Sequence, residues 1–184
     1  MTEVMTARKP KAKPGWSDVK SQLIGFDRAG LIELVRHLYT ASKENQAFLH
    51  ARFALRNDVL EPYKKTIARW LGPDVCTNQD ISLSKAKKAI SDYKKAVGQP
   101  AGLAELMVFY CEQAAGFSQD IGLQDEGYFE ALVRMFEQAL KVLMTFPTAE
   151  RDSLWERMDR VRRMSHGFGY GVGDDMDYLL AKVD

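Results

Sequence analysis

The chain has 184 residues, of which 46% are hydrophobic and 28% are charged, and its formal net charge is +1. This length and composition are ordinary for a globular protein that buries a core without disulfides or metals. The two cysteines, Cys76 and Cys111, stand far apart and form no CxxC motif. Their arrangement excludes a disulfide framework and indicates a reducing compartment, the cytoplasm.

Membrane and secretory segments are not expected. No apolar run approaches the roughly 18 residues that a membrane-spanning helix needs. The first residues, MTEVMTARKPKAKPGW, are basic but are not followed by an apolar segment, so they do not read as a signal peptide. Because prolines interrupt this stretch and few of its residues are apolar, the sequence predicts a disordered basic tail over 1–15. Residues 16–184 are predicted to form a single helical domain.

The near-neutral total hides an uneven distribution of charge. Residues 1–95 hold 18 Lys/Arg against 10 Asp/Glu, whereas residues 96–184 hold 8 against 15. Such a split indicates either an electrostatic partner surface or two halves of one domain that attract each other. The second explanation is the commoner one.

Three helices are predicted in the first third of the chain. Ser17 can cap a short helix that ends at Gly25, with Val19, Leu23 and Ile24 turned inward. Asp27 can cap a second helix, whose apolar residues repeat with a period of 3.6: Leu31, Leu34, Val35, Leu38 and Tyr39. A third helix over 43–56 repeats the spacing with Phe48, Leu49 and Phe53.

The remaining elements are also helical. A helix over about 58–71 has Pro62 in its first turn and stops at Gly72-Pro73, and a polar loop over 72–83 leads to the lysine-rich helix SKAKKAISDYKKAVG. Pro100 opens a long helix with the apolar stripe Leu103, Met107, Tyr110, Ala114, Phe117 and Ile121. The next helix carries Phe129, Leu132, Val133, Phe136, Leu140 and Leu143. Thr148 is expected to cap a helix to about Ser165, and DDMDYLLAKVD closes the chain as a short helix.

These elements predict an all-α fold of seven to eight helices. Short connections between helices favour antiparallel hairpins, stacked as a bundle or as a short α-solenoid. No fixed repeat period separates the two architectures, because both bury one apolar stripe per helix.

A possible surface for an anionic partner lies on the lysine-rich helix. Ala86, Ala89, Ile90, Tyr93 and Val97 share one side of that helix, so its lysines occupy the other. We define the lysine surface as the five lysines of this helix together with two lysines of the preceding helix. Its members are Lys85, Lys87, Lys88, Lys94, Lys95, Lys64 and Lys65. It would attract phosphates or an acidic protein, although a solvated helix face is the commoner explanation for such lysines.

The segment HGFGYGVG over 166–173 places glycines at alternate positions. A glycine-rich segment can cradle phosphate at a helix N-terminus, but the spacing matches neither GxGxxG nor the P-loop, and Asp174 and Asp175 would repel phosphate. We therefore predict a packed connector, in which Phe168 and Tyr170 lie against the body and Asp174 caps the last helix.

The sequence contains no recognisable catalytic, cofactor or metal motif. His37, His50 and His166 are isolated, and His37 is expected to be half-buried and structural. Glu105 and Glu112, like Glu130 and Glu137, stand seven residues apart and could converge as in a di-metal bundle, but no ExxH motif accompanies them and a polar surface is expected. An enzyme would require a deep pocket in which His166 or another titratable group meets a carboxylate pair.

Three stretches resemble an uncharacterised bacterial family catalogued as a domain of unknown function. They are LSKAKKAISDYKK at 83–95, LAELMVFYCEQAAGFSQDIGLQDEGYFEALVRMFEQAL at 103–140 and HGFGYGVGDDMDYL at 166–179. The resemblance covers most of the chain beyond residue 20 and implies an all-helical, soluble bacterial protein. It implies no activity and assigns no catalytic residue.

Two functional hypotheses follow. The first is a non-enzymatic helical interaction module that binds a protein through a groove between helix pairs or associates with itself. The second is a nucleic-acid-associated protein that uses the basic tail and the lysine surface. A membrane partner is not expected.

Overall fold

The computed structural model describes residues 13–55, 58–74 and 79–183. The chain is 76% helical, and no strand occurs in these ranges, which confirms the all-α prediction. The described helices number nine, close to the seven to eight expected. The predicted disordered tail over 1–15 falls mostly outside the described residues. Among the described helices, none combines the length and the hydrophobicity required to cross a bilayer.

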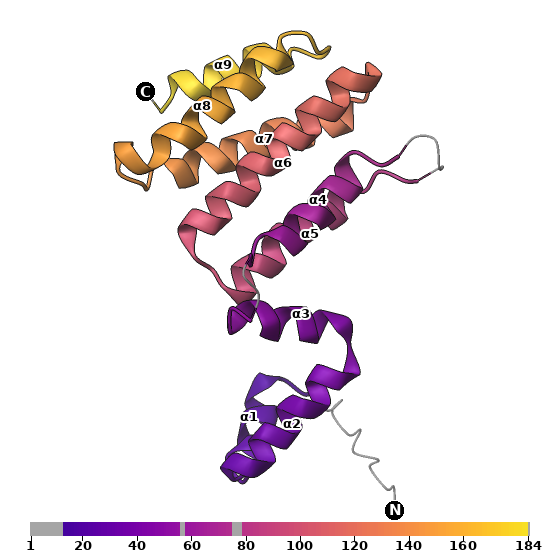
Figure 1. The fold of residues 1–184 in the computed structure, drawn as a ribbon, viewed down its shortest axis with the longest axis vertical. Helices are drawn as coiled ribbons and strands as arrows, with labels where there is room; N and C mark the ends of the chain where they lie inside the picture. The colour runs from indigo at the N-terminus through magenta and orange to yellow at the C-terminus, as the bar shows by residue number, and fades with distance from the viewer. Residues whose placement is uncertain (1–12, 56–57, 75–78, 184) are drawn as a thin grey trace, which may run out of the picture. The chain divides into compact units, whose positions relative to one another are not determined.

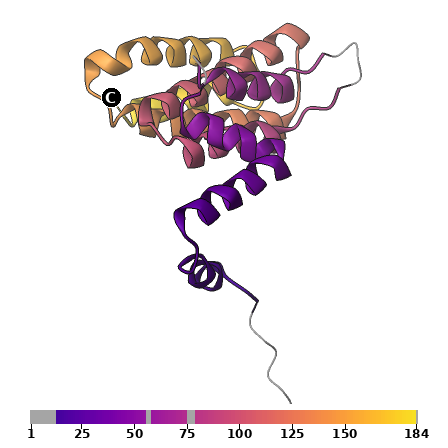
Figure 2. The same cartoon turned by 60° about the horizontal axis from the view of Figure 1, so that its bottom comes forward.

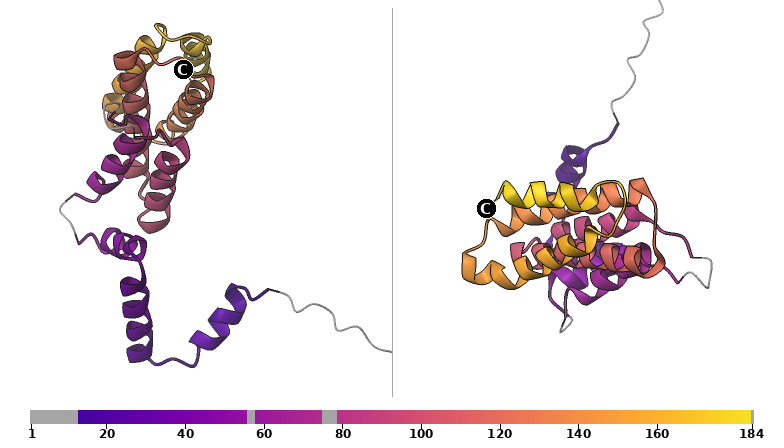
Figure 3. Two further views of the ribbon diagram at one scale, coloured as in Figure 1. Left: turned by 90° about the vertical axis from the view of Figure 1, so that its right-hand side faces the viewer. Right: turned by 90° about the horizontal axis from the view of Figure 1, so that it is seen from above.

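Contacts divide the chain into two units, residues 1–46 and 47–184, and each is described here by itself. The assignment of residues 16–184 to one domain stays a prediction. In the first unit, α1 (Trp16–Leu23) and α2 (Arg28–Ala41) diverge from the turn between them (Figure 3), and α3 (Lys43–Arg52) crosses the boundary between the units.

The N-cap predicted for the first helix is wrong, and the N-cap predicted for the second helix is confirmed. Helix α1 begins one residue before Ser17, and its N-cap is Gly15, whose backbone N–H donates to Asp18 Oδ2 at 2.6 Å. Because Ser17 already lies inside the helix, its hydroxyl is not the cap. The prediction for α2 is confirmed, since Asp27 Oδ1 accepts a hydrogen bond of 2.7 Å from the Gly30 backbone N–H.

The apolar stripes of the first unit are not covered. Helices α1, α2 and α3 contain no buried residue. Val19, Ile24 and Val35 were expected to point inward but are exposed, Ile24 by 78%. Likewise, His37 is exposed beside Glu33 instead of half-buried. Periodicity identifies the apolar side of a helix, but it does not supply the surface that covers that side.

The second unit is a stack of three antiparallel helix pairs (Figures 1 and 2). The pairs are α4 (Glu61–Leu71) with α5 (Leu83–Ala96), α6 (Pro100–Ile121) with α7 (Glu126–Leu143), and α8 (Thr148–Ser165) with α9 (Val172–Ala181). Each pair packs mainly on its neighbour in sequence, with α4 on α6, α6 on α8 and α7 on α9. This successive stacking is that of a short α-solenoid rather than of a closed bundle.

Helix α6 lies at the centre of this stack, against α4, α5, α7 and α8. Its buried residues therefore cover about half of the helix circumference, a wider side than the single stripe expected: Ala104, Leu106, Met107, Val108, Tyr110, Cys111, Ala114, Ala115 and Ser118. Gly102 permits the closest approach to α5, because a Cβ at this position would collide with the phenol of Tyr93. Of the expected stripe, Met107, Tyr110 and Ala114 are buried, Leu103 and Phe117 are half-buried, and Ile121, at the last turn, is exposed.

The stripe predicted for α7 is confirmed, since Phe129, Leu132, Phe136, Leu140 and Leu143 are buried and Val133 is half-buried. In α8, Met158 and Val161 are buried. Pro147, and not Thr148, occupies the N-cap of α8, because Thr148 is already the first helical residue.

Phe136 offers a direct test of this core. It is fully buried in the main core cluster, so Phe136→Ala should lower the free energy of unfolding by about 3–5 kcal/mol through lost contacts and a cavity. Phe53→Ala is the control, because Phe53 is 66% exposed and its truncation should change that free energy by only about 0.5 kcal/mol. Chemical denaturation measures both variants, and equal effects would contradict the core assignment.

Candidate functional site

An ion-pair network joins all three helix pairs of the second unit. Arg157 of α8 reaches α6, where its Nη1 lies 2.6 Å from Glu105 Oε2 and its Nη2 lies 2.6 Å from Glu112 Oε2. Lys64 of α4 approaches the other oxygen of Glu105, with Nζ 2.6 Å from Oε1. The side chains are half-buried, with Glu105 20% and Arg157 26% exposed. We call Lys64, Glu105, Glu112 and Arg157 the four-residue ion network.

The pKa directions show that these charges stabilise one another. Burial acts to raise the pKa of Glu105, but hydrogen bonds from Arg157 and Lys64 outweigh it and hold the pKa below its ordinary value. Hydrogen bonding to Glu112, opposed by burial and reinforced by Glu105, raises the pKa of Arg157. Glu105 and Arg157 are therefore charged at neutral pH, and a guanidinium that bridges two carboxylates fixes their positions well.

This network changes the interpretation of the glutamates. Glu105 and Glu112 were expected on a polar surface, and that expectation is wrong, because α8 covers them with Arg157. The expectation is confirmed for Glu130, which is exposed, and for Glu137, which is partly exposed; they pair with Arg134 and Lys141 along their own helix. The two pairs of glutamates thus have separate basic partners, and these four carboxylates do not form a shared di-metal arrangement.

Helices α4 and α5 bring the two groups of the lysine surface onto one helix pair, but most of these lysines already have partners. Lys64 belongs to the ion network, and its ammonium also lies 5.3 Å from the Phe109 ring centroid. Lys65 is 3.4 Å from Glu61, and Lys88 is 2.6 Å from Asp92.

The other lysines differ among themselves. The ammonium of Lys85 lies over the Trp70 ring, 3.8 Å from its centroid. Lys87 is half-buried, and burial, followed by the nearby positive charge of Arg134, lowers its pKa. Lys94 and Lys95 are exposed at the last turn of α5. The surface is therefore less available to phosphates than a count of its lysines suggests.

The glycine-rich segment is a packed connector, as predicted, but its cap is different. The Phe168 ring stacks on Phe129 of α7, with centroids 5.4 Å apart and planes inclined by 11°. Tyr170 also contacts Phe129, at 5.9 Å, although its side chain stays largely exposed. The N-cap of α9 is Gly171 at φ 70°, so the prediction for Asp174 is wrong. The left-handed turn starts the helix earlier and places Asp174 within its first turn.

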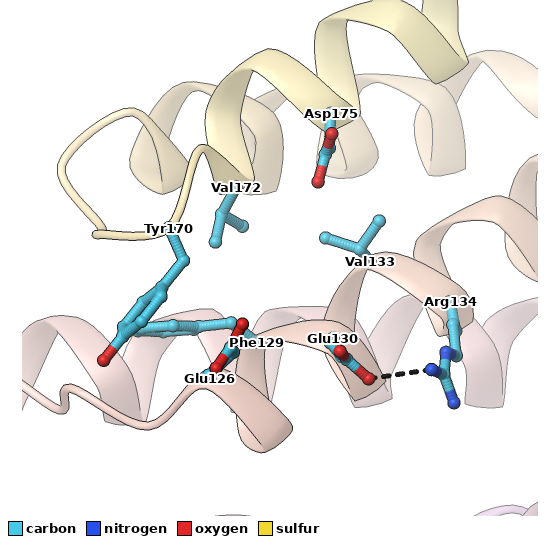
Figure 4. A pocket seen from close by; sticks show the side chains of 8 residues that line it. All are labelled: Glu126, Phe129, Glu130, Val133, Arg134, Tyr170, Val172 and Asp175. Atoms are coloured by element: carbon cyan, nitrogen blue, oxygen red, sulfur yellow. Dashed lines mark hydrogen bonds and ion pairs between the residues drawn. The ribbon is translucent and has the colours of Figure 1, made fainter.

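A shallow groove lies beside this connector (Figure 4). It encloses about 350 Å³ between α7 and the start of α9. Its apolar lining consists of Phe129, Val133, Tyr170 and Val172, and its charged lining of Glu126, Glu130, Arg134 and Asp175. The groove lies between two helix pairs, and its volume is at the lower end of the range that is typical of small-molecule sites.

His166 meets two carboxylates, Asp174 and Asp177, which the sequence did not identify as its partners, and all three residues lie exposed at the surface and not in a deep pocket. Its Nε2 is 3.2 Å from Asp177 Oδ2, and one ligand atom each of His166, Asp174 and Asp177 lie within 4.8 Å of one another. However, Asp177 Oδ1 already accepts a hydrogen bond of 2.6 Å from Arg162, which together with His166 lowers the pKa of Asp177 against the effect of burial. The guanidinium opposes a cation here, and the groove described above does not include His166.

Eight of the sixteen large hydrophobic side chains that are exposed among the described residues belong to the first unit. Its large exposed side chains are Trp16, Val19, Ile24, Phe26, Leu31, Ile32, Val35 and Leu38, which we call the N-terminal apolar face. Trp16 and Val19 share one side of α1, and Leu31, Val35 and Leu38 share one side of α2. Apolar surface of this extent, left on a helical segment, is typical of an interaction site.

The ion network supports a prediction about stability. Arg157→Met leaves two half-buried carboxylates with Lys64 as the only basic partner, and should lower the free energy of unfolding by about 1–3 kcal/mol, between the values for exposed and buried pairs. Arg134→Met is the control, because it breaks only an exposed pair with Glu130 and should cost about 0.5 kcal/mol or less.

The pH dependence follows from the direction of the Glu105 shift. The depressed pKa contributes stability that is complete above the ordinary value of 4.5 and is lost as pH falls through the folded value. Without Arg157, only Lys64 opposes the rise that burial causes in the pKa of Glu105. The difference in free energy of unfolding between Arg157→Met and the native protein should therefore shrink as the pH falls. Denaturation at neutral and acidic pH measures this difference, and a difference that widens in acid would contradict the assignment.

Gly173 tests the contact between the connector and α8. A Cβ at this position would lie 2.6 Å from His166 Nδ1 and 2.8 Å from His166 Cα. Gly173→Ala must therefore push α9 away from α8 and should destabilise the protein by about 1–3 kcal/mol. Gly116→Ala is the matched control, because a Cβ there meets no atom within 4 Å and alanine should stabilise α6 by about 0.5–1 kcal/mol. Thermal unfolding of the two variants should shift in opposite directions.

No protein-family model, curated protein or solved structure matches this chain. The resemblance to the bacterial family of unknown function stays a prediction.

Proposed function

We propose that this protein is a non-enzymatic helical interaction module that binds a protein partner through its N-terminal apolar face. The observation that carries the proposal is that α1, α2 and α3 contain no buried residue although their large apolar side chains are exposed, Trp16 by 70%. Its separate cysteines favour the reducing cytoplasm as the place of action.

The stability of the helices themselves supports the proposal. Helix α1 has 8 residues and α2 has 14, and isolated helices shorter than about 12–15 residues are only marginally stable in water. Helices in proteins gain most of their stability from packing an apolar side against another surface. Among the described residues, the closely packed helix pairs all lie between α4 and α9. A protein partner would supply the packing that α1 and α2 lack.

The charged groups described above also favour this function over catalysis. The half-buried residues of the ion network hold α4, α6 and α8 together, and Asp177 is engaged by Arg162. These are the roles of structural ion pairs, which shift pKa values without performing chemistry.

Nucleic-acid binding through the lysine surface remains the alternative proposal. It would depend on contacts between lysines and phosphates. It has less support than protein binding, because Lys64, Lys65 and Lys88 contact carboxylates of the same chain.

Photo-crosslinking tests the proposal. We replace Val35, on the apolar side of α2, with p-benzoylphenylalanine in the full chain, and irradiate cells in which the protein occurs naturally. The control places the same group at Glu33, two residues away on the opposite side of the helix, where the native carboxylate pairs with Arg36. A protein adduct should form from position 35 and not from position 33.

Nuclease treatment of the irradiated sample distinguishes the alternative. Under the proposal, the adduct keeps its mass after digestion. An adduct that shrinks with nuclease, or the absence of any adduct from position 35, would contradict protein binding through this face.

A further inference from the structure

We infer that the N-terminal apolar face docks on the same face of a second copy of this chain, so that two α1–α2 segments form a two-fold symmetric four-helix interface. The inference rests on the proposed function and names its partner. In a two-fold symmetric dimer the same patch of each copy forms the interface. If residue i of one copy contacts residue j of the other, then residue j of the first copy also contacts residue i of the second. One apolar stripe on α1 and one on α2 supply the two inward sides that each copy needs for a four-helix arrangement.

The area of the face matches a stable dimer. Its eight large side chains are 39% exposed at the least, and Ile32 is 60% exposed. Such side chains offer on the order of 100 Å² each, so two copies would bury about 800 Å² per partner, the size of a standard specific interface. A tryptophan and a phenylalanine among mainly aliphatic residues give the apolar composition that is typical of homodimer interfaces.

The surface of the second unit offers no comparable apolar acceptor within the part of the chain that the structure describes. Phe48, Phe53 and Leu55 are exposed on α3 and just after it, and over the helical stack the other large exposed hydrophobic residues are isolated on different elements: Ile81, Ile121, Met144, Tyr170 and Tyr178. Scattered residues of this kind are normal for a protein surface. Among the described residues the first unit thus holds the larger group of exposed apolar side chains, and a second copy offers a group of the same character.

The charges around the face favour a second copy over a strongly acidic or basic partner. Residues 13–46 hold five Lys/Arg against four Asp/Glu, so the segment is almost neutral. On α2, Glu33 pairs with both Arg36 and His37 of its own helix. Two such surfaces approach without net repulsion, whereas recognition of a charged partner would require an excess of the opposite sign.

Sedimentation equilibrium of the full chain measures the oligomeric state. At micromolar concentration the mass should be twice the 20.8 kDa of the chain. Val35→Asp should raise the dissociation constant on the order of 100-fold or more, because the symmetry buries an unpaired carboxylate from each copy. His37→Asp is the matched control, because it places the same carboxylate on the exposed, opposite side of α2 and should leave the dimer intact.

Hydrogen exchange on the same samples keeps the test valid for a variant that is poorly folded. Amides of α6 and α7 should stay protected in both variants, because the main core does not include Val35 or His37. Amides of α1 and α2 should be protected in the native dimer and exchange rapidly after dilution or in Val35→Asp.

Two results would overturn the inference: a native chain that stays monomeric over this concentration range, or a dimer that Val35→Asp and His37→Asp weaken equally. Photo-crosslinking then distinguishes a failure of the dimer from a failure of the proposed function. An adduct between position 35 and a different protein would leave the proposed function standing without the dimer, whereas no adduct at all would remove both.

Discussion

Helix α6 is covered on several sides, and the second unit depends on this arrangement. Helices α4, α5, α7 and α8 all pack on it, and α9 joins the stack through α7 and α8. A helix in this position must be apolar around most of its circumference, and α6 is rich in alanine and other small residues that let its neighbours approach closely. Gly102 against Tyr93 is the extreme case, since only glycine leaves room for the ring.

The ion network lies where three helices of different pairs meet, on the side of α6 that is not fully apolar. An apolar contact would tolerate a shift of α8 along α6, but Arg157 must reach Glu105 and Glu112, about two helical turns apart, at the same time. We infer that the network selects the register of the stack more than it adds to stability. Half-buried ion pairs often have this role, because their desolvation offsets much of their attraction.

The two units differ in how far they bury their apolar side chains. The second unit buries Tyr110, Phe129 and Phe136 completely, and its stack needs no further partner to form a core. The first unit has the same amphipathic periodicity but nothing of its own to cover it. Because short helices with exposed apolar sides are costly to leave in water, the interaction proposal follows from the first unit rather than from any chemistry in the second.

Local features of the chain could be predicted from the sequence, because they depend on neighbouring residues. The helical periodicity, the stop at Gly72-Pro73, the Asp27 cap and the apolar stripe through Phe136 all follow from residues within a turn or two of one another. The prediction that Asp174 caps α9 was wrong for a similarly local reason. Gly171 adopts a left-handed backbone conformation, and the helix therefore begins before the aspartates.

What the sequence could not determine depends on which helices become neighbours. Arg157 is 45 residues from Glu112, and no spacing rule relates an exposed-looking arginine to a carboxylate on another helix. His166 meets Asp177 only because the chain reverses between α8 and α9. The stripes of α1 and α2 have the same periodicity as those of α7, yet only the latter are covered. The sequence by itself determined which residues form helices and which side of each helix is apolar. Only the tertiary structure decided which of those sides are buried, because burial requires a second surface that lies elsewhere in the chain or in another molecule.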